Sequence, residues 1–303
     1  MNKLKIKAWV HAARLRTLPL SVSGIVLAGF IAYSQGKFHS DVFILALIAT
    51  LLLQILSNLA NDYGDYAHGT DNDNRVGPER AVQSGVISPK EMKRAIYIIG
   101  LLAFHAGMFL LTTSLDRVFS YIFILFLITG LVAIGAAIKY TIGKNPFGYK
   151  GFGDIMVFLF FGIAAVFGTH FLLTLKTQWL ILLPAAAIGL LSAGVLNINN
   201  MRDIVNDKNS GKITLAVKLG KTGSKIYHTL IIAISLLLLS LYLLFLDKTW
   251  VMVSLTIPAI PLLIHCIKVA KNHDPYKLDP ELKRLSLSTL FISLWIGIGL
   301  TLF

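Results

Sequence analysis

The sequence predicts an all-α integral membrane protein, a bundle of nine transmembrane helices with candidate active-site loops on the cytoplasmic side. Of its 303 residues, 55% are hydrophobic and only 14% are charged, and the mean hydropathy is +0.72. A soluble domain is usually about a quarter charged, so this composition favours a membrane protein. Apolar stretches of roughly 20 residues, the length that crosses a bilayer, recur along the whole chain. We predict nine, at 18–36, 41–60, 95–114, 118–138, 154–175, 178–198, 226–246, 250–270 and 285–303.

The distribution of Lys and Arg supports this count and sets the orientation. With nine spans, the N-terminus and every second loop share one side, and that side holds 24 of the 28 Lys and Arg. The other side holds only Lys37, Arg117, Lys176 and Lys248. Positive charge collects in cytoplasmic loops. We therefore expect a multi-pass protein of a bacterial-type inner (cell) membrane, with the N-terminus cytoplasmic, the C-terminus opposite, and the active site at the cytoplasmic face.

The segment before the first span, residues 1–17, mixes Lys and Arg with Leu, Ile, Trp and Val. This mixture is typical of a helix that lies in the membrane interface, although charge that only sets topology explains it equally well. The remaining chain has no linker that would divide it, so we expect one domain over 1–303. The net charge of +13 follows from topology and predicts no nucleic-acid partner. The single cysteine, Cys266, excludes an internal disulfide.

Two polar clusters end apolar spans on the predicted cytoplasmic side. In the first, NLANDYGD, a continuing helix would put Asn58, Asp62 and Asp65 on one face at i, i+4 and i+7. In the second, NINNMRDIVNDK, Asn199 and Asp203 repeat the i, i+4 spacing, and Asp207 follows at i+8. The repeat of Asn-x-x-x-Asp suggests two related halves.

Oxygen ligands of this kind suit Mg²⁺, which binds one or two carboxylates together with substrate phosphates. Two facing carboxylate clusters would hold Mg²⁺ and a diphosphate between them, with neighbouring Arg and Lys on the remaining phosphate oxygens. The alternative is that these residues are helix caps or solvated loop positions. A proton or ion pathway is a further alternative, but it expects carboxylates in the middle of a span.

The two clusters, NDYGDYAHGTDNDNRVGPERAVQSG and NNMRDIVNDKNSGKITLAVKLG, resemble those of the UbiA-type intramembrane aromatic prenyltransferases. Together with the opening segment AARLRTLPLSVSG, these clusters resemble the sequences of one branch of that family, the branch that prenylates 1,4-dihydroxy-2-naphthoate in menaquinone synthesis. The resemblance implies that a polyprenyl diphosphate and this acceptor are the substrates, with membrane lipid around the protein and Mg²⁺ as the cofactor. Decarboxylative transfer would give demethylmenaquinol, CO₂ and diphosphate.

The resemblance also implies roles for individual residues. Asn58, Asp62 and Asp65 would hold Mg²⁺ on one side of the diphosphate, and Asp203 and Asp207 on the other, so that these four carboxylates carry the catalysis. The implied substrate-binding set is Asn58, Asn61, Arg75, Arg80, Lys139, Tyr140, Asn199, Arg202 and Lys212.

Two alternatives to this function remain at the level of sequence. The first is a prenyltransferase of the same superfamily that uses another acceptor, 4-hydroxybenzoate or homogentisate. The second belongs to a different class, a carrier or transporter that binds a polyprenyl diphosphate without breaking it. The one-sided placement of the polar residues disfavours the transporter, since alternating access expects a site at the midplane.

Overall fold

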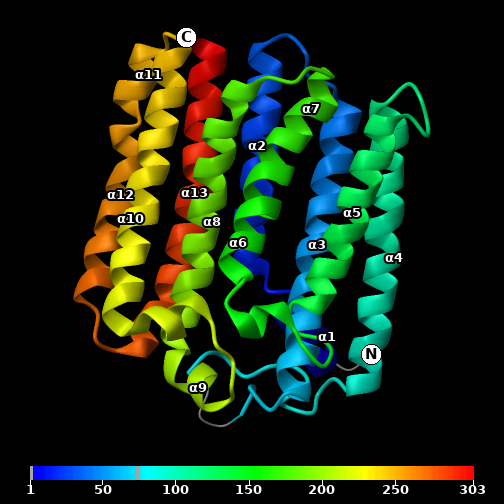
Figure 1. Cartoon of the computed structure of the whole chain (residues 1–303), viewed down its shortest axis with the longest axis vertical. Coiled ribbons are helices and arrows are strands. Elements are labelled where there is room, and N and C mark those ends of the chain that lie inside the picture. Colours follow the sequence, from blue (N-terminus) through cyan, green and yellow to red (C-terminus); the bar gives the residue numbers. More distant parts are fainter. Residues whose placement is uncertain (1–2, 73–75) are drawn as a thin grey trace.

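The computed structural model describes residues 3–72 and 76–303, and within these ranges the chain folds into helices joined by loops. The long helices run side by side along one axis, with the N-terminus at the lower end of the bundle and the C-terminus at the upper end (Figure 1). The elements are α1 (Lys3–Ala12), η1 (Leu15–Thr17), α2 (Leu18–Ser34), α3 (Ser40–Ala67), α4 (Pro89–Ser114), α5 (Tyr121–Lys139), η2 (Phe147–Lys150), α6 (Gly153–Val157), η3 (Phe158–Gly168), α7 (Thr169–Thr174), η4 (Trp179–Ile181), α8 (Leu182–Arg202), α9 (Ile204–Asn209), α10 (Leu215–Phe245), α11 (Thr249–Ser254), α12 (Thr256–Lys271), η5 (Pro275–Leu278) and α13 (Asp279–Leu302).

Nine helical units in the described ranges are long and apolar enough to cross a membrane, which confirms the predicted number. The first unit joins α1, η1 and α2, and the fifth joins α6, the π-helical segment η3 and α7. An odd number of crossings agrees with termini at opposite ends of the bundle. Four units reach 28 residues or more, well beyond the roughly 20 that span the hydrocarbon.

Several helices extend further toward the N-terminal end of the bundle than hydropathy predicts. The second span was expected to end at residue 60, but α3 continues to Ala67. The seventh was expected to begin at residue 226, but α10 begins at Leu215. Hydropathy reports the part of a helix that lies in lipid, whereas the backbone hydrogen bonds continue into the charged segments beyond it. Asn58, Asp62 and Asp65 therefore lie on the end of a helix rather than in a loop.

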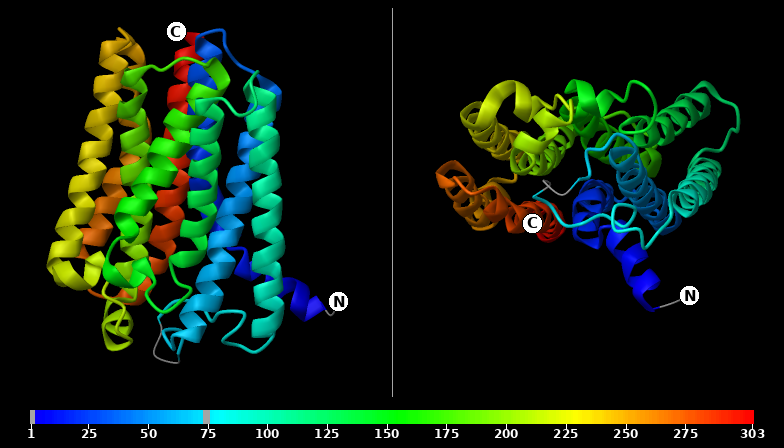
Figure 2. Two further views of the ribbon diagram at one scale, coloured as in Figure 1. Left: turned by 45° about the vertical axis from the view of Figure 1, so that its right-hand side comes forward. Right: turned by 90° about the horizontal axis from the view of Figure 1, so that it is seen from below.

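The N-terminal segment leaves the bundle at its lower end, where α1 runs outward from the other helices (Figure 2, left). Leu4, Ile6 and Val10 of α1 are exposed, while Trp9 packs against the buried cluster that includes Leu56 of α3. Exposed apolar residues beside lysines agree with an interfacial helix, and that location stays a prediction. What the structure adds is that α1 and η1 lie directly against the polar end of α3.

Small residues allow the central helix α8 to approach its neighbours closely. A side-chain Cβ at Gly162 of η3 would lie 2.5 Å from the carbonyl oxygen of Ala185 and 2.7 Å from the Cα of Gly189. Close backbone approach at small residues is the usual packing of helices in membranes. Around this contact, α8 also packs against α10 and α13, so it forms the centre of the larger buried core.

This contact gives a matched pair of stability predictions. Gly162→Ala should lower the free energy of unfolding by about 1–3 kcal/mol, because its methyl group overlaps backbone atoms of α8. Gly135→Ala, on α5, should instead raise it by roughly 0.5–1 kcal/mol, since nothing lies within 4 Å of the added carbon. Unfolding of both variants in mixed micelles tests this; shifts of the same sign would contradict it.

Candidate active site

The last turns of α3 bring the first polar cluster into the protein interior. Asn58, Asp62 and Asp65 are all buried, and the predicted continuation of the helix through them is confirmed. The two carboxylates nevertheless meet different partners. Asp62 accepts the backbone N–H groups of Ala81 and Val82, both at 3.2 Å, and so fixes the loop that follows α3. Asp65 faces cationic side chains.

These cationic side chains and the carboxylates around them form what we call the carboxylate–cation cluster. Lys212 Nζ lies 3.3 Å from Asp65 Oδ1 and 3.9 Å from Asp207 Oδ1. Arg80 lies 3.7 Å from Asp65 Oδ2 through its Nη2 atom and 3.7 Å from Asp71 Oδ1 through Nε. Three buried carboxylates thus surround two buried cations. A buried charge is tolerated only when it is paired, so the cluster depends on this pairing.

Three loops meet at the cluster, at the lower end of the bundle in Figure 1. The hydroxyl of Tyr149 donates to Asp65 Oδ1 at 2.9 Å and accepts from the hydroxyl of Thr70 at 2.6 Å. Asn206 Nδ2 donates to the carbonyl of Thr70 at 2.8 Å, and Ile213 N donates to the carbonyl of Tyr149 at 3.1 Å. The segments that follow α3, α5 and α8 are therefore joined to one another.

The charges of the cluster shift the pKa values of two side chains outside the membrane spans, Lys212 and Tyr149. Burial alone would lower the pKa of Lys212, but the carboxylates of Asp65 and Asp207 raise this pKa well above its ordinary value. Burial raises the pKa of Tyr149, and the charge of Asp65 raises it further. At neutral pH the ammonium group is therefore charged and the phenol is protonated, so both act as donors to Asp65.

The second cluster is ordered differently from the simple helical face that its spacing predicts. The helix α8 ends at Arg202, and after a break at Asp203 the chain forms the short helix α9, on which Asp207 lies. The Arg202 side chain is fully buried and binds both oxygens of Asp203, Asn199 Oδ1 at 2.9 Å and Asp279 Oδ1 at 2.5 Å. Arg202 is thus occupied by protein groups, and its position supports orienting Asp203 rather than the predicted direct contact with a diphosphate.

The other four predicted binding residues differ in where they lie. Tyr140 lies beside the cluster, interacts electrostatically with Lys212 and Asp65, and borders an apolar cavity. Asn61 Oδ1 accepts a hydrogen bond from the hydroxyl of Thr141 at 3.3 Å. Lys139 is exposed and makes no hydrogen bond or ion pair with the cluster among the described residues, so its role stays a prediction. Arg75 lies outside the described residues.

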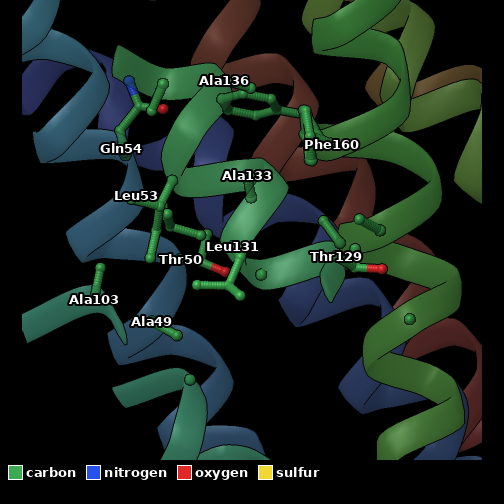
Figure 3. A pocket seen from close by; sticks show the side chains of 18 of the residues that line it. Ala49, Thr50, Leu53, Gln54, Ala103, Thr129, Leu131, Ala133, Ala136 and Phe160 are labelled. Atoms are coloured by element: carbon green, nitrogen blue, oxygen red, sulfur yellow. The ribbon is translucent and has the colours of Figure 1, made fainter. Parts of the chain in front are cut away.

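An apolar cavity of about 280 Å³ extends from the cluster into the membrane-spanning part of the bundle. Its walls come from α2, α3, α4, α5 and the fifth span. Figure 3 shows Leu53 and Gln54 of α3, Ala133 of α5 and Phe160 of η3 around this space. At the end nearest the cluster it is bounded by Tyr140 and Phe147, whose rings pack edge to face. A long apolar substrate could be held here with its polar end at the carboxylates.

The donor set of the cluster fits a magnesium–diphosphate rather than a metal alone. Among residues 3–72 and 76–303, no three His, Cys, Asp or Glu side chains form a ready-made metal site. Magnesium is commonly held by one or two carboxylates together with substrate phosphates and water. Asp65 and Asp207 could supply the carboxylates, and Lys212 and Arg80 could bind the remaining phosphate oxygens.

Sequence reasoning missed one residue of the site and undervalued another. Tyr149 lies in KNPFGYKGFG, a segment that reads as a glycine-rich connector, and no pattern there signals a bond to Asp65. In the sequence Asp71 is an ordinary carboxylate in the loop after α3, yet its side chain is completely buried against Arg80. Its placement six residues after Asp65, without helical spacing, gave no reason to group it with that residue.

Comparison with known proteins agrees with this architecture. The sequence profile of the UbiA prenyltransferase family matches residues 22–298. The chain is 42% identical over 300 residues to the 1,4-dihydroxy-2-naphthoate octaprenyltransferase of Escherichia coli (strain K12), covering 98% of this chain and 96% of that protein. It is 41% identical over 302 residues to the Haemophilus influenzae protein of the same name, with the same two coverages.

Two solved structures share the fold at 16% sequence identity. The apo structure of a UbiA homologue from Aeropyrum pernix K1 aligns with a TM-score of 0.65 over 96% of both chains. The structure of a UbiA homologue from Archaeoglobus fulgidus bound to DMAPP and Mg²⁺ aligns with a TM-score of 0.59, covering 95% of this chain and 99% of the other.

The position of Lys212 between two carboxylates predicts a stability effect that Mg²⁺ can offset. Without divalent cations, Lys212→Met should lower the free energy of unfolding by about 3–5 kcal/mol, because Asp65 and Asp207 lose their shared cation. Added Mg²⁺ should restore part of the loss. Lys208→Met, at an exposed position on α9, should change the free energy of unfolding by less than about 0.5 kcal/mol.

The pH dependence of the same effect has a definite sign. A lysine whose pKa is raised on folding contributes its full stability below its ordinary pKa, 10.5, and loses this contribution progressively as the pH rises from there through the raised value. The penalty of Lys212→Met should therefore be equal at pH 6 and at pH 9. A penalty that disappears at pH 9 would mean that Lys212 is neutral there.

Proposed function

The chain belongs to the UbiA prenyltransferase family, and from this we propose that it transfers a polyprenyl group from an all-trans polyprenyl diphosphate to 1,4-dihydroxy-2-naphthoate. The products are demethylmenaquinol, CO₂ and diphosphate, a step of menaquinone biosynthesis. The relatives at 41% and 42% identity over nearly the full chain carry this activity in their names. The observation that carries the proposal is the carboxylate–cation cluster at the mouth of a long apolar cavity.

The diphosphate group of the donor binds at the cluster. The ammonium of Lys212 and the guanidinium of Arg80 would bind phosphate oxygens, and the carboxylates that pair with these cations would be available to hold the metal. Asp65 and Asp207 are the principal ligands that we propose, with Asp62, Asp203 and Asn58 as further members of the predicted set. When bound, Mg²⁺ stabilises the negative charge that develops on the leaving diphosphate.

The reaction then needs one bond exchange at each substrate. The C–O bond between the prenyl group and the diphosphate breaks, and the electron pair leaves with the diphosphate. The ring carbon that bears the carboxylate forms the new C–C bond to the allylic carbon. The bond from that ring carbon to the carboxylate then breaks, so that its electrons restore the aromatic ring and CO₂ departs.

The apolar cavity supports the other requirement, which is protection of the allylic cation from water. The rings of Tyr140 and Phe147 border the end of the cavity nearest the cluster, where the cation forms. The electron-rich face of an aromatic ring attracts a cation. Since the pKa of Tyr140 is raised by burial, its phenol stays protonated and is a poor competing nucleophile.

We further propose that residues 1–303 act as one domain and that the cluster faces the cytoplasm. The support is the excess of Lys and Arg at the end of the bundle that carries the cluster. That orientation gives the charged acceptor and the released diphosphate direct access to water, while the prenyl chain stays among apolar helices.

The decisive experiment for the acceptor is a competition assay. Purified enzyme receives 1,4-dihydroxy-2-naphthoate, 4-hydroxybenzoate and homogentisate together, with a labelled prenyl diphosphate and Mg²⁺. We expect the label in demethylmenaquinol with one CO₂ released for each transfer. Label on another ring would assign the protein to a different acceptor. A donor that is bound and recovered intact, with flux across vesicles, would favour a carrier instead.

Neutralising either half of the metal–diphosphate site should stop the transfer. Asp65→Asn and Asp207→Asn should each lower kcat by about 10²-fold or more, because charge on the leaving group is no longer balanced. Asp116→Asn, an exposed position in the loop between α4 and α5, should leave kcat unchanged. Full activity of either cluster variant at saturating Mg²⁺ would exclude the two-sided site.

The cavity predicts the response to chain length. A Cβ at Gly130 of α5 would meet nothing within 4 Å, and this residue lines the cavity. Gly130→Phe should therefore fill the space without disturbing the fold, and raise KM for long prenyl diphosphates much more than for dimethylallyl diphosphate. Equal effects on both donors would show that the chain runs elsewhere.

A further inference from the structure

One buried carboxylate near the apolar cavity takes no part in the carboxylate–cation cluster. Asp154 lies on α6, the short helix that begins the fifth span, and the residue is 6% exposed. Four other buried aspartates, Asp65, Asp71, Asp203 and Asp207, each pair with a lysine or arginine. In the described part of the chain, no cationic side chain forms an ion pair with Asp154. A buried charge without a partner is costly, so its presence needs a functional explanation.

A single neutral group holds the Asp154 carboxylate in place. The hydroxyl of Tyr227, on α10, donates to Asp154 Oδ1 at 3.3 Å. Asp154 Oδ2 is buried and makes no hydrogen bond among the described residues. Asp62, by comparison, accepts a backbone N–H on each of its oxygens. Buried polar atoms are normally satisfied, and a catalytic role is one reason for an exception.

Asp154 lies directly behind the end of the cavity where the allylic cation forms. The preceding residue, Gly153, lines the cavity, and a Cβ added to it would lie 3.0 Å from the hydroxyl oxygen of Tyr140. Met156 and Val157, from the same turn, line the cavity as well. Asp154 itself is not among the lining residues. Its carboxylate is therefore close to the reaction centre but separated from it by the wall that its neighbours form.

The electrostatic effect of Asp154 reaches the cavity through this wall. Burial is the main cause that raises the pKa of Tyr140, and the charge of Lys212 opposes it. Of the carboxylates, Asp154 raises this pKa most, ahead of Asp65 and Asp207. Charges interact over longer distances in an apolar interior than in water. A positive charge that forms beside Tyr140 is therefore within the electrostatic range of Asp154.

We propose that the Asp154 carboxylate stabilises the allylic cation of the prenyl donor from behind the cavity wall. This inference rests on the proposed function and adds to it the stabilisation of the positive reaction centre. As the C–O bond breaks, its electron pair leaves with the diphosphate, and positive charge remains on the allylic carbons. Lys212 and Arg80 attract the negative product, and Asp154 attracts the positive one. Fixed charges of opposite sign thus favour bond breaking from both ends.

The position behind the wall also prevents a side reaction. A carboxylate in contact with an allylic cation would bond to it and form an ester, which would inactivate the residue. Asp154 Oδ2 is inaccessible, and the residue does not line the cavity. Electrostatic attraction acts through the intervening atoms, whereas bond formation needs contact. The burial that makes this charge costly therefore also keeps it from reacting.

The proposal predicts that Asp154→Asn separates activity from stability. The reacting carbon is positive only as the bond breaks, so loss of the charge should lower kcat roughly tenfold and leave KM for the donor unchanged. The free energy of unfolding should not fall, because an unpaired buried charge is removed. Asp247→Asn, at an exposed position between α10 and α11, should match wild type in both measurements. Parallel loss of activity and stability in Asp154→Asn would assign Asp154 a structural role and overturn the proposal.

Tyr227→Phe is the complementary variant. It removes the hydrogen bond to Asp154 Oδ1 and leaves the charge of the carboxylate. We expect it to lower the free energy of unfolding, because the carboxylate loses its donor, and to reduce kcat much less than Asp154→Asn does. A loss of kcat as large as that of Asp154→Asn would show that the contact between α6 and α10 matters rather than the charge.

A charged donor analogue tests the same idea without turnover and without an acceptor. 2-(Dimethylamino)ethyl diphosphate carries an ammonium group at the position of one allylic carbon that bears the cationic charge, and 3-methylbutyl diphosphate has the same shape without that charge. Calorimetry measures the binding of each analogue to the purified protein in the presence of Mg²⁺. Asp154→Asn should bind the ammonium analogue roughly tenfold more weakly than wild type does, and the neutral analogue equally well.

Equal losses for both analogues, or no loss for either, would overturn the proposal. The result does not depend on which acceptor the enzyme uses. If wild type fails to prenylate 1,4-dihydroxy-2-naphthoate but the loss is confined to the ammonium analogue, the proposed function fails and the role of Asp154 stands. If wild type and Asp154→Asn prenylate this acceptor at the same rate, the proposed function stands and the role of Asp154 fails.

Discussion

The structure depends on the pairing of buried carboxylates with buried cations at one end of an apolar bundle. Lys212 and Arg80 occupy the space between Asp65, Asp71 and Asp207, where each charge would be unfavourable if it were alone. This pairing is loose, since four of the contacts lie between 3.3 and 3.9 Å. Cations held at such distances are able to move to phosphate oxygens, so the arrangement suits a site that exchanges internal ion pairs for a ligand.

That exchange needs a fixed frame, and the interlocked loops provide it. Tyr149 connects the segment after α5 to Asp65, and Asn206 connects the segment after α8 to the carbonyl of Thr70. Each of these contacts uses a neutral donor rather than one of the two cations. The loops therefore keep their positions when Lys212 and Arg80 change partners. The shape of the site and its charge balance are controlled by different residues.

Hydropathy was sufficient for the nine spans, because crossing a bilayer is a local property of about 20 residues. It also brought the two polar clusters to one side, since both end spans of the same direction. Hydropathy could not predict which residues from distant parts of the sequence form ion pairs with one another. Arg202 reads as a free basic residue until α13 brings Asp279, 77 positions away, against it. The separate roles of Asp62 and Asp65 likewise depend on the tertiary contact between the loop at Ala81 and Asp62. The helical spacing of the two carboxylates does not predict that contact.

The end of α3 gives this division a simple geometrical basis. Gln54, Asn58 and Asp62 lie at successive i, i+4 positions, and they bind η1, the preceding turn and the loop at Ala81. Asp65 comes three residues later, so it leaves the helix about 60° around its axis from Asp62, toward Lys212. A helix that ended at residue 60, as hydropathy suggests, could not separate these directions. The continuation of α3 into its charged segment is what allows one helix to hold the loop at Ala81 through Asp62 and to face the two cations through Asp65.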